Sequence, residues 1–360
     1  MKHDTKKLKV FFLTGLVLAM VVWVNAGNLT PPAGPVTGTM KDLATVEPRT
    51  PITSLPFTIS SPGSYYVAKD LTGTSGQHGI AIASSDVSLD LSGFTLRGIP
   101  GSLNGIHVSG SRAKIRISNG IVCNWGGGGI NTQSGDKVTI MYAVARDNGD
   151  YGVCTNGDTT VLYMNSNNNQ NKGLVIGDRC ICKDAECCNN GSDGIMTGSG
   201  CKIEDCVTSS NGGNGLAAGI GSMVTICVAQ SNTLDGIQAA DGCSVIQCTV
   251  RANINDGIEV NAQCLVLNNN SSNNGAGIGD GAGIHVVGSP GGGTRVDTNN
   301  CTGNDRNFDV DSTGNIITRN SSFGGTVPFD IAVGNSVGAV INVAGNGAFA
   351  VANAWSNFVY

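Results

Sequence analysis

The chain of 360 residues is poor in charged and aromatic side chains, and these shortages exclude several classes of function. Charged residues make up only 13%, and no basic cluster occurs in a chain of net charge −5, so a nucleic-acid partner is not expected. There are only four histidines, and no C-x-x-C motif is matched by a second one or by a histidine cluster, which argues against a zinc site. The hydrophobic fraction of 40% excludes a disordered chain.

Long apolar runs are also scarce, and the one that occurs lies at the N-terminus. Val10–Val24 follows several lysines and precedes Val24-Asn25-Ala26, which has the small-residue pattern of a signal-peptidase site. The run is shorter than the roughly 20 residues that a membrane-spanning helix needs. We therefore expect residues 1–26 to be a cleaved signal peptide, so that the mature protein is secreted or lies at the cell surface without a membrane segment. A retained membrane anchor is the alternative.

Glycine, in contrast, is abundant at 53 residues, and a Gly-aliphatic pair recurs at a strict step of 21 residues. The pairs are Gly152-Val153, Gly173-Leu174, Gly194-Ile195, Gly215-Leu216, Gly236-Ile237 and Gly257-Ile258. An asparagine lies four residues before each glycine: Asn148, Asn169, Asn190, Asn211, Asn232 and Asn253. Looser steps extend the series from Gly79-Ile80 to Gly283-Ile284. Such periodicity is typical of a solenoid in which each repeat is one turn.

Stacking explains why these residue types recur. Equivalent residues of successive turns would lie about 4.8 Å apart, the spacing of neighbouring strands. The aliphatic residues then form a column that no single repeat could bury alone, and the asparagine amides can hydrogen-bond along the axis. We expect each asparagine to lie in the turn before the strand, in the left-handed conformation that asparagine tolerates.

Thirteen cysteines are many for an exported chain, and most of them fall into two further columns that divide the repeat into three strands. Cysteines precede the glycine by nine residues at Cys206, Cys227 and Cys248, and follow it by seven at Cys180, Cys201, Cys243 and Cys264. A small, polarizable thiol packs well in a narrow interior, so buried free thiols are expected. Disulfides are the alternative, because Cys182/Cys187, Cys201/Cys206 and Cys243/Cys248 share an i, i+5 spacing.

The rungs from about Gly79 to Phe308 resemble bacterial, secreted right-handed parallel β-helix repeat proteins of the pectin-lyase-like superfamily. The segments Pro51–Tyr66, Val87–Phe94 and Asn353–Phe358 share the resemblance. It implies an all-β, right-handed parallel β-helix with three strands per rung of roughly 21 residues. The superfamily contains lyases, hydrolases, epimerases, adhesins and tail fibres, so it implies no single activity. No paired Asp-Asp with a downstream Gly-His-Gly and Arg-x-Lys occurs, and no catalytic residue therefore carries over.

The repeat boundaries suggest a domain organisation. We expect residues 27–72 to form an N-terminal extension and cap, residues 73–323 the parallel β-helix, and residues 324–360 a C-terminal cap or association segment. Both ends need a cover because an open sheet edge pairs readily with another chain. The apolar C-terminal segment could also join two copies into a homo-oligomer.

The repeat lengthens at three places, where loops project from the scaffold and binding sites are expected. The inserted segments are Ile99–Asn104, Asn124–Gly128 and Asn273–Ala282. Polar residues gather around the third. Glu259 and His285 follow the aliphatic residue on neighbouring rungs and should point outward. The candidate catalytic residues are Glu259, His285 and Arg251, the candidate metal ligands are Asp235 and Asp256, and the candidate substrate-binding residues are Asp280, His107 and Trp125.

Two functions are compatible with this pattern. The first is an extracellular or cell-surface scaffold or binding protein that contacts polysaccharide. The second is a polysaccharide lyase-like or hydrolase-like enzyme acting on an acidic uronate polymer, in which Ca²⁺ held by stacked carboxylates neutralises the sugar carboxylate while a base removes a proton. If neither holds, the acidic residues are solvated turn residues and His285 is an exposed polar residue.

Overall fold

A computed structural model describes residues 47–275, 281–287, 291–343 and 353–360. The expected signal peptide and Asp280 lie outside the described residues. The strands described below all belong to the unit Arg49–Tyr360. Within the described ranges, no helix has the length and apolar character needed to cross a membrane.

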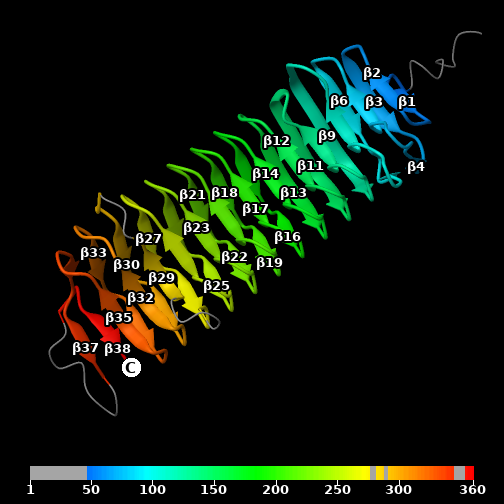
Figure 1. Cartoon of the computed structure of the whole chain (residues 1–360). Coiled ribbons are helices and arrows are strands. Elements are labelled where there is room, and N and C mark those ends of the chain that lie inside the picture. Colours follow the sequence, from blue (N-terminus) through cyan, green and yellow to red (C-terminus); the bar gives the residue numbers. More distant parts are fainter. Residues whose placement is uncertain (1–46, 276–280, 288–290, 344–352) are drawn as a thin grey trace, which may run out of the picture. The chain divides into compact units, whose positions relative to one another are not determined.

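The strands form parallel ladders in which each rung pairs with the rung before and after it (Figure 1). A 13-stranded sheet takes one strand per rung: β2 (Phe57–Ile59), β5 (Ile80–Ile82), β8 (Ile106–Val108), β10 (Ile130–Thr132), β12 (Val153–Thr155), β14 (Leu174–Ile176), β17 (Ile195–Thr197), β20 (Leu216–Ala218), β23 (Ile237–Ala239), β26 (Ile258–Val260), β29 (Ala282–Val286), β32 (Arg306–Val310) and β35 (Val327–Ile331).

A 25-stranded sheet contains the other two ladders. The first is β1 (Thr50–Ile52), β3 (Gly63–Val67), β6 (Val87–Asp90), β9 (Arg112–Cys123), β11 (Gly135–Arg146), β13 (Thr160–Asn167), β15 (Ile181–Lys183), β18 (Lys202–Glu204), β21 (Met223–Thr225), β24 (Ser244–Ile246), β27 (Leu265–Leu267), β30 (Arg295–Asp297), β33 (Ile316–Thr318) and β36 (Ser336–Val337). The second joins β4 (Leu71–Thr72) and β7 (Thr95–Arg97), through β9, β11 and β13, to β16 (Glu186–Cys188), β19 (Val207–Ser209), β22 (Val228–Gln230), β25 (Thr249–Arg251), β28 (Asn270–Ser272), β31 (Asn300–Thr302), β34 (Ser321–Phe323), β38 (Asn357–Val359) and β37 (Val340–Asn342). The fold class is thus the expected all-β parallel β-helix with three strands per rung.

The strands of the 13-stranded sheet show why a Gly-aliphatic pair recurs. In β17 the first and third residues face the interior and Met196 faces outward, as the period of a strand requires. Ile195 is fully buried and is in register with Leu174 before it and Leu216 after it. The preceding glycine is needed because a Cβ at Gly194 would lie 2.7 Å from the carbonyl oxygen of Gly215 on the next rung.

Each rung bends at three corners, and the corner geometry corrects the expectation for asparagine. In one rung, Arg179, Asp184 and Asn189 have positive φ values of 57°, 52° and 56°. The residue after each of them faces the interior, and after Asn189 this is Asn190 of the repeat column. The left-handed conformation is therefore adopted by the residue before each asparagine of the 21-residue repeat, and not by that asparagine as expected. The reason is that the asparagine side chain has to point inward.

The inward asparagines form a continuous ladder. The backbone N–H and the Nδ2 of Asn190 both donate to Oδ1 of Asn211, at 3.1 and 3.0 Å. The Nδ2 of Asn211 also donates to the carbonyl of Cys187 at 2.9 Å. The same pattern links Asn148 through to Asn274 and then, across an insertion, to Asn304. Each amide thus satisfies backbone groups that water cannot reach.

The cysteine columns occupy the same kind of corner position and have the same role. The backbone N–H of Thr159 donates to Sγ of Cys180 at 3.2 Å, and that of Cys201 donates to Oγ of Ser222 at 3.1 Å. The thiol of Cys201 in turn donates to the carbonyl of Gly177 at 3.1 Å. All thirteen cysteines are free and buried. A thiol, a hydroxyl or an amide can therefore alternate along one column, provided that its side chain both accepts and donates.

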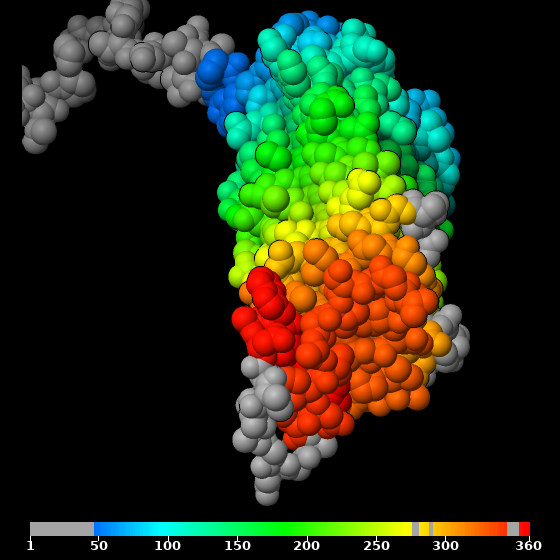
Figure 2. All heavy atoms as spheres, turned by 90° about the vertical axis from the view of Figure 1, so that its left-hand side faces the viewer, coloured from blue at the N-terminus to red at the C-terminus, as the bar shows by residue number. Residues whose placement is uncertain are grey.

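The pairing extends beyond residues 73–323 at both ends. Within residues 27–72, which were expected to form an N-terminal extension and cap, β2 is in register with β5 and β4 is in register with β7. At the other end, β35 adds to β32, and Phe329 stacks on Phe308 with ring centroids 4.8 Å apart. Figure 2 is turned so that these C-terminal rungs, in orange and red, face the viewer.

The asparagine ladder leads to a stability prediction. Asn211→Ala removes the acceptor of two Asn190 donors and leaves the carbonyl of Cys187 without its donor. Since each unsatisfied buried group costs about 1–3 kcal/mol, we expect the free energy of unfolding to fall by at least about 3 kcal/mol in chemical denaturation. The control Asn270→Ala removes an exposed amide and should change it by less than about 0.5 kcal/mol. Equal effects of the two substitutions would contradict the ladder.

Candidate functional site

The outward positions of the 13-stranded sheet carry a row of polar residues on its C-terminal rungs. Glu259 of β26 is in register with His285 of β29, as the sequence predicted. His285 is in register with Asp309 of β32, which is in register with Asp330 of β35. The Nε2 of Gln238 donates to Oε1 of Glu259 at 2.9 Å and extends the row by one rung. We call Gln238, Glu259, His285, Asp309 and Asp330 the polar row.

A second column runs beside the polar row, in the turn that enters the sheet. Oδ1 of Asp235 accepts the backbone N–H of Asp256 at 3.1 Å, and Asn214 accepts that of Asp235 at 3.0 Å. Oδ1 of Asp256 accepts the N–H of Ala282 at 2.5 Å. Asp235 and Asp256 are only 3% and 2% exposed, so they are not solvated turn residues. Their carboxylates replace the missing partners of backbone groups at this turn.

The second carboxylate oxygen of Asp256 holds His285. Nδ1 of His285 lies 2.9 Å from Oδ2 of Asp256, and Nε2 lies 3.3 Å from Oδ2 of Asp311. The side chain of Asp256 is 3% exposed and that of His285 is 16% exposed, whereas Asp311 is largely open to solvent. The imidazole is therefore fixed in orientation by one buried carboxylate and presented to solvent beside another. His285 is not the freely exposed polar residue that was considered as an alternative.

The charges around this site shift two pKa values in functionally relevant directions. Burial by itself favours a neutral His285, but its hydrogen bond to Asp256, the charges of Asp256 and Asp309, and the hydrogen bond to Asp311 together raise the pKa of His285 to about 9. Burial, reinforced by the charges of Glu259 and Asp256, raises the pKa of Asp235 to about 7. At neutral pH the site thus combines a cationic imidazolium with a carboxyl group that is close to half protonation.

Two groups of side chains at this site have donor atoms close enough to share a metal ion. They are Asp256, Glu259 and His285, and His285, Asp309 and Asp311, in each of which the donor atoms lie within 4.8 Å of one another. Asp235 belongs to neither of these two groups, and its Oδ1 accepts the backbone N–H of Asp256 and Nδ2 of Asn255. An imidazole binds a metal only when it is neutral, so the imidazolium competes with a cation at neutral pH.

The remaining predicted site residues lie elsewhere or have other roles. Arg251 belongs to β25 of the 25-stranded sheet, and within the described ranges its side chain has no hydrogen bond or ion pair with Asp256, Glu259 or His285. His107 does face outward, but on β8, several rungs before β26, where its ring stacks on His78 with centroids 4.2 Å apart. Asp280 lies outside the described residues.

Trp125, an expected substrate-binding residue, is buried in the core, although it also lines a cavity of about 490 Å³ near the first two insertions. Its side chain is 1% exposed, and its Nε1 donates to the carbonyl of Leu96 at 3.1 Å. The ring fills space that Gly73, Gly79 and Gly105 leave open, since a Cβ at any of these glycines would lie within 2.8 Å of it. An indole packed in this way offers no ring face to a sugar. The inserted segment around Trp125 therefore contributes its only large aromatic side chain to the core.

Sequence reasoning missed Asp309 and Asp311. The repeat at this rung reads Asn307-Phe308 in place of a Gly-aliphatic pair, so it does not match the motif used to align the rungs. Phe308 nevertheless occupies the inward aliphatic position, in register with Ile284. Accepting phenylalanine at that position would have placed Asp309 in the polar row.

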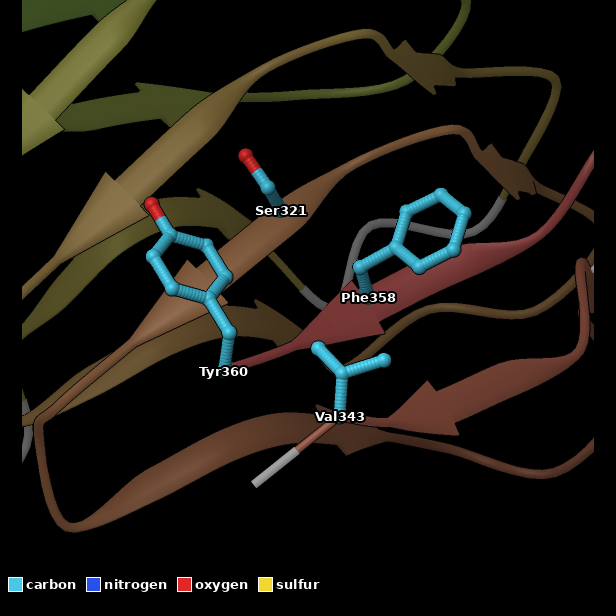
Figure 3. A pocket seen from close by; sticks show the side chains of 4 residues that line it. All are labelled: Ser321, Val343, Phe358 and Tyr360. Carbon is cyan, nitrogen blue, oxygen red and sulfur yellow. The ribbon is translucent and has the colours of Figure 1, made fainter. Parts of the chain in front are cut away.

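Two pockets formed by described residues lie away from His285. One, of about 380 Å³, lies at the C-terminal end and is lined by Ser321, Val343, Phe358 and Tyr360, without a charged side chain (Figure 3). The other, of about 490 Å³, lies near the first two insertions and includes Arg97 and Asp147.

The raised pKa of His285 predicts a pH-dependent stability. Since the pKa is higher in the folded chain, about 9 against the usual 6.5, protonation stabilises the fold fully below pH 6.5, and this contribution is lost as the pH rises through 9. The difference in unfolding free energy between the wild type and His285→Gln should therefore shrink by roughly 3 kcal/mol across that window, measured by denaturation in EDTA. A difference that does not depend on pH would contradict the ion pairs with Asp256 and Asp311.

Comparisons with known proteins agree with this architecture. No protein-family model and no curated protein matches the sequence. The structure is similar to the A-module of the mannuronan C-5 epimerase AlgE6 from Azotobacter vinelandii, with a TM-score of 0.54 and 14% identity over 80% of this chain and 88% of that chain. The A-module of AlgE4 from the same organism gives a TM-score of 0.49 and 15% identity over 80% and 90% of the two chains. The catalytic domain of a GH87 alpha-1,3-glucanase gives 0.45 and 10% identity over 80% and 62%.

At 14% identity the likeness to the AlgE6 module shows the fold and not the activity. The ladders, the rungs and the first of these matches lead to one conclusion: the chain is a parallel β-helix repeat protein with the pectin-lyase-like fold.

Proposed function

We propose that the protein is exported and binds a hydroxyl-rich polysaccharide along the outer face of the 13-stranded sheet, with the polar row as the contact surface. The observation that carries the proposal is the fixing of His285 between Asp256 and Asp311 on an outward strand face. Neighbouring polar residues continue on both sides of it, at the strand spacing of about 4.8 Å. A linear polymer lying along the axis could contact each of these rungs in turn.

The chemistry of the polar row suits sugar hydroxyls. The carboxylates of Glu259 and Asp330 are strong acceptors for O–H donors, and the imidazolium of His285 is a donor to sugar oxygens, whereas Asp309 is buried and paired with Arg306. The similarity in fold to a mannuronan C-5 epimerase module supports a saccharide as the ligand. On the three rungs before Gln238 the outward positions carry Val175, Met196 and Ala217, which are small or apolar.

The charge of this face constrains the polymer. Carboxylates outnumber the two cations, His285 and Arg306, so the face is acidic at neutral pH. A neutral polymer meets no repulsion here, whereas a uronate polymer would need a bridging cation such as Ca²⁺, which prefers carboxylate oxygens. Binding of a neutral glycan should therefore be insensitive to EDTA, and binding of a uronate glycan should be lost in EDTA.

A binding assay tests the proposal. Affinity electrophoresis against a panel of neutral and uronate polysaccharides should show retardation of the mature protein. Glu259→Gln and His285→Ala should weaken it about tenfold or more, because each removes a charged hydrogen-bonding group. Glu186→Gln, an exposed carboxylate on β16 of the other sheet, is the matched control and should bind as the wild type does. Absence of retardation throughout the panel, or equal effects of all three variants, would exclude the polar row as a glycan surface.

A second function, elimination on a uronate polymer, is favoured by the position of the His285 imidazolium beside the carboxylate of Glu259. Such a reaction needs a base that removes the C5 proton and an acid that protonates the leaving oxygen. Because His285 is protonated at neutral pH, it can act only as the acid, and Glu259 is the outward carboxylate close enough to act as the base. A cation would have to neutralise the sugar carboxylate.

Absorbance of the unsaturated product distinguishes an enzyme from a binding protein. If elimination occurs, the mature protein with Ca²⁺ should generate that product from at least one uronate polymer. Glu259→Gln should lower the rate at least a hundredfold, as loss of a general base does, while Glu186→Gln leaves it unchanged. If the wild-type protein binds these polymers but the absorbance does not rise, elimination is excluded and binding is the function.

A further inference from the structure

The cavity of about 490 Å³ near the first two insertions is separate from the polar row and follows from a change in rung length. Successive glycines of the repeat are 26 residues apart between Gly79 and Gly105, then 24 apart up to Gly129, and the next rungs are shorter. The extra residues of the first longer rung include Ile99 and Pro100, which line the cavity together with residues of the rungs that follow. The cavity falls in the size range of ligand pockets, about 300–1,000 Å³.

The floor and wall of this cavity are rigidly built. Oγ of Ser102 donates to the carbonyl of Ile99 at 2.7 Å and accepts the N–H of Gly126 at 3.2 Å, which ties the projecting loop to the next rung. Gly149 donates its N–H to the carbonyl of Trp125 at 2.7 Å. A Cβ at Gly149 would lie 2.3 Å from the carbonyl oxygen of Gly126, so the floor is bare backbone. The pocket is therefore preformed and does not depend on a flexible segment.

The rim carries polar groups that are only partly used within the protein. Nη1 of Arg97 donates to Oδ1 of Asn124 at 3.3 Å, and in the described part of the chain Arg97 has no ion pair. Asp147 also lines the cavity but is paired with Arg146. The nearby carboxylate of Asp70 accepts the backbone N–H of Thr95 and does not line the cavity. Most of the donors of the Arg97 guanidinium therefore remain available for a ligand.

The other lining residues complete a surface with two kinds of chemistry. Gln170 and Asn124 present amides that can both donate to and accept from hydroxyl groups, while Ile99 and Pro100 form an apolar wall. A pyranose ring has the matching properties, namely an apolar C–H face and a polar edge. The free guanidinium adds selectivity for an anion, because arginine binds a carboxylate through two parallel hydrogen bonds.

We propose that this cavity is a binding site for a single carboxylated sugar unit, with Arg97 as the carboxylate-binding residue. The site deepens the polysaccharide-binding function proposed above and rests on it for the class of ligand. Arg97, Asn124 and Gln170 contact the polar edge of the ring, and Pro100 packs against its C–H face. The cavity thereby recognises an acidic unit of a glycan, whereas the acidic polar row favours neutral units.

Calorimetric titration with a matched pair of short ligands tests this site. The probes are a glucuronate-containing disaccharide and the same disaccharide with its carboxyl group reduced to an alcohol. The wild type should bind the acidic probe about tenfold more tightly than the neutral one, and Arg97→Gln should abolish that difference without changing affinity for the neutral probe. Gln170→Glu places a negative charge on the rim. This substitution should lower the affinity for the acidic probe and leave the affinity for the neutral probe unchanged.

Controls separate this site from the polar row and from misfolding. Arg116→Gln, an exposed arginine of β9 outside the cavity, should bind both probes as the wild type does. His285→Ala should retain disaccharide binding even if it loses polymer binding. If Arg97→Gln binds the acidic probe normally, or if the wild type binds neither probe or both equally, the cavity is not a uronate site. If instead His285→Ala leaves polymer binding unchanged, the polar-row proposal fails independently.

Discussion

A hydrogen bond from the backbone of one rung to an inward side chain on the next rung is the interaction on which this molecule depends. At each corner the chain bends from one ladder of strands to the next, and the corner N–H points along the axis into a region without water. The partner is an asparagine amide along one corner, as between Asn190 and Asn211, and a thiol, hydroxyl or amide along the others, as between Cys201 and Ser222. Because the donor and acceptor sit on successive rungs, each rung is stable only when stacked on its neighbours.

This constraint decides where the sequence is free to vary. The asparagine ladder passes from Asn274 to Asn304, and a parallel one from Asn269 to Asn299, although each pair is 30 residues apart instead of 21. Extra residues are therefore accommodated outside the ladders as loops. The cavity beside Arg97 has the same origin, since it lies where longer rungs give way to shorter ones. Function can be added at these positions without loss of the internal hydrogen bonds.

The need to satisfy backbone N–H groups at the turns also accounts for the buried carboxylates beside His285. Asp235 and Asp256 each accept a backbone N–H in the turn before the 13-stranded sheet, which is a structural role. A carboxylate has two oxygens, however, and the second oxygen of Asp256 faces the outward strand, where it holds His285. A buried structural carboxylate thus fixes the orientation and protonation of a surface imidazole. This is a route by which a repeat scaffold can acquire a polar site through a single histidine substitution.

The sequence by itself determined the architecture, because the Asn and Gly-aliphatic columns at a step of 21 residues can be buried only by stacking. It also placed Glu259 beside His285, since strand register follows directly from the repeat. It could not place Asp309 and Asp311, where the motif is degenerate, and it misjudged Trp125, whose burial depends on glycines of other rungs. The sequence likewise could not show that Arg251 lies on the 25-stranded sheet and not beside His285. Only the tertiary structure decided which turn carboxylates are buried and which outward residues share a face, because both depend on how the corners direct side chains between rungs.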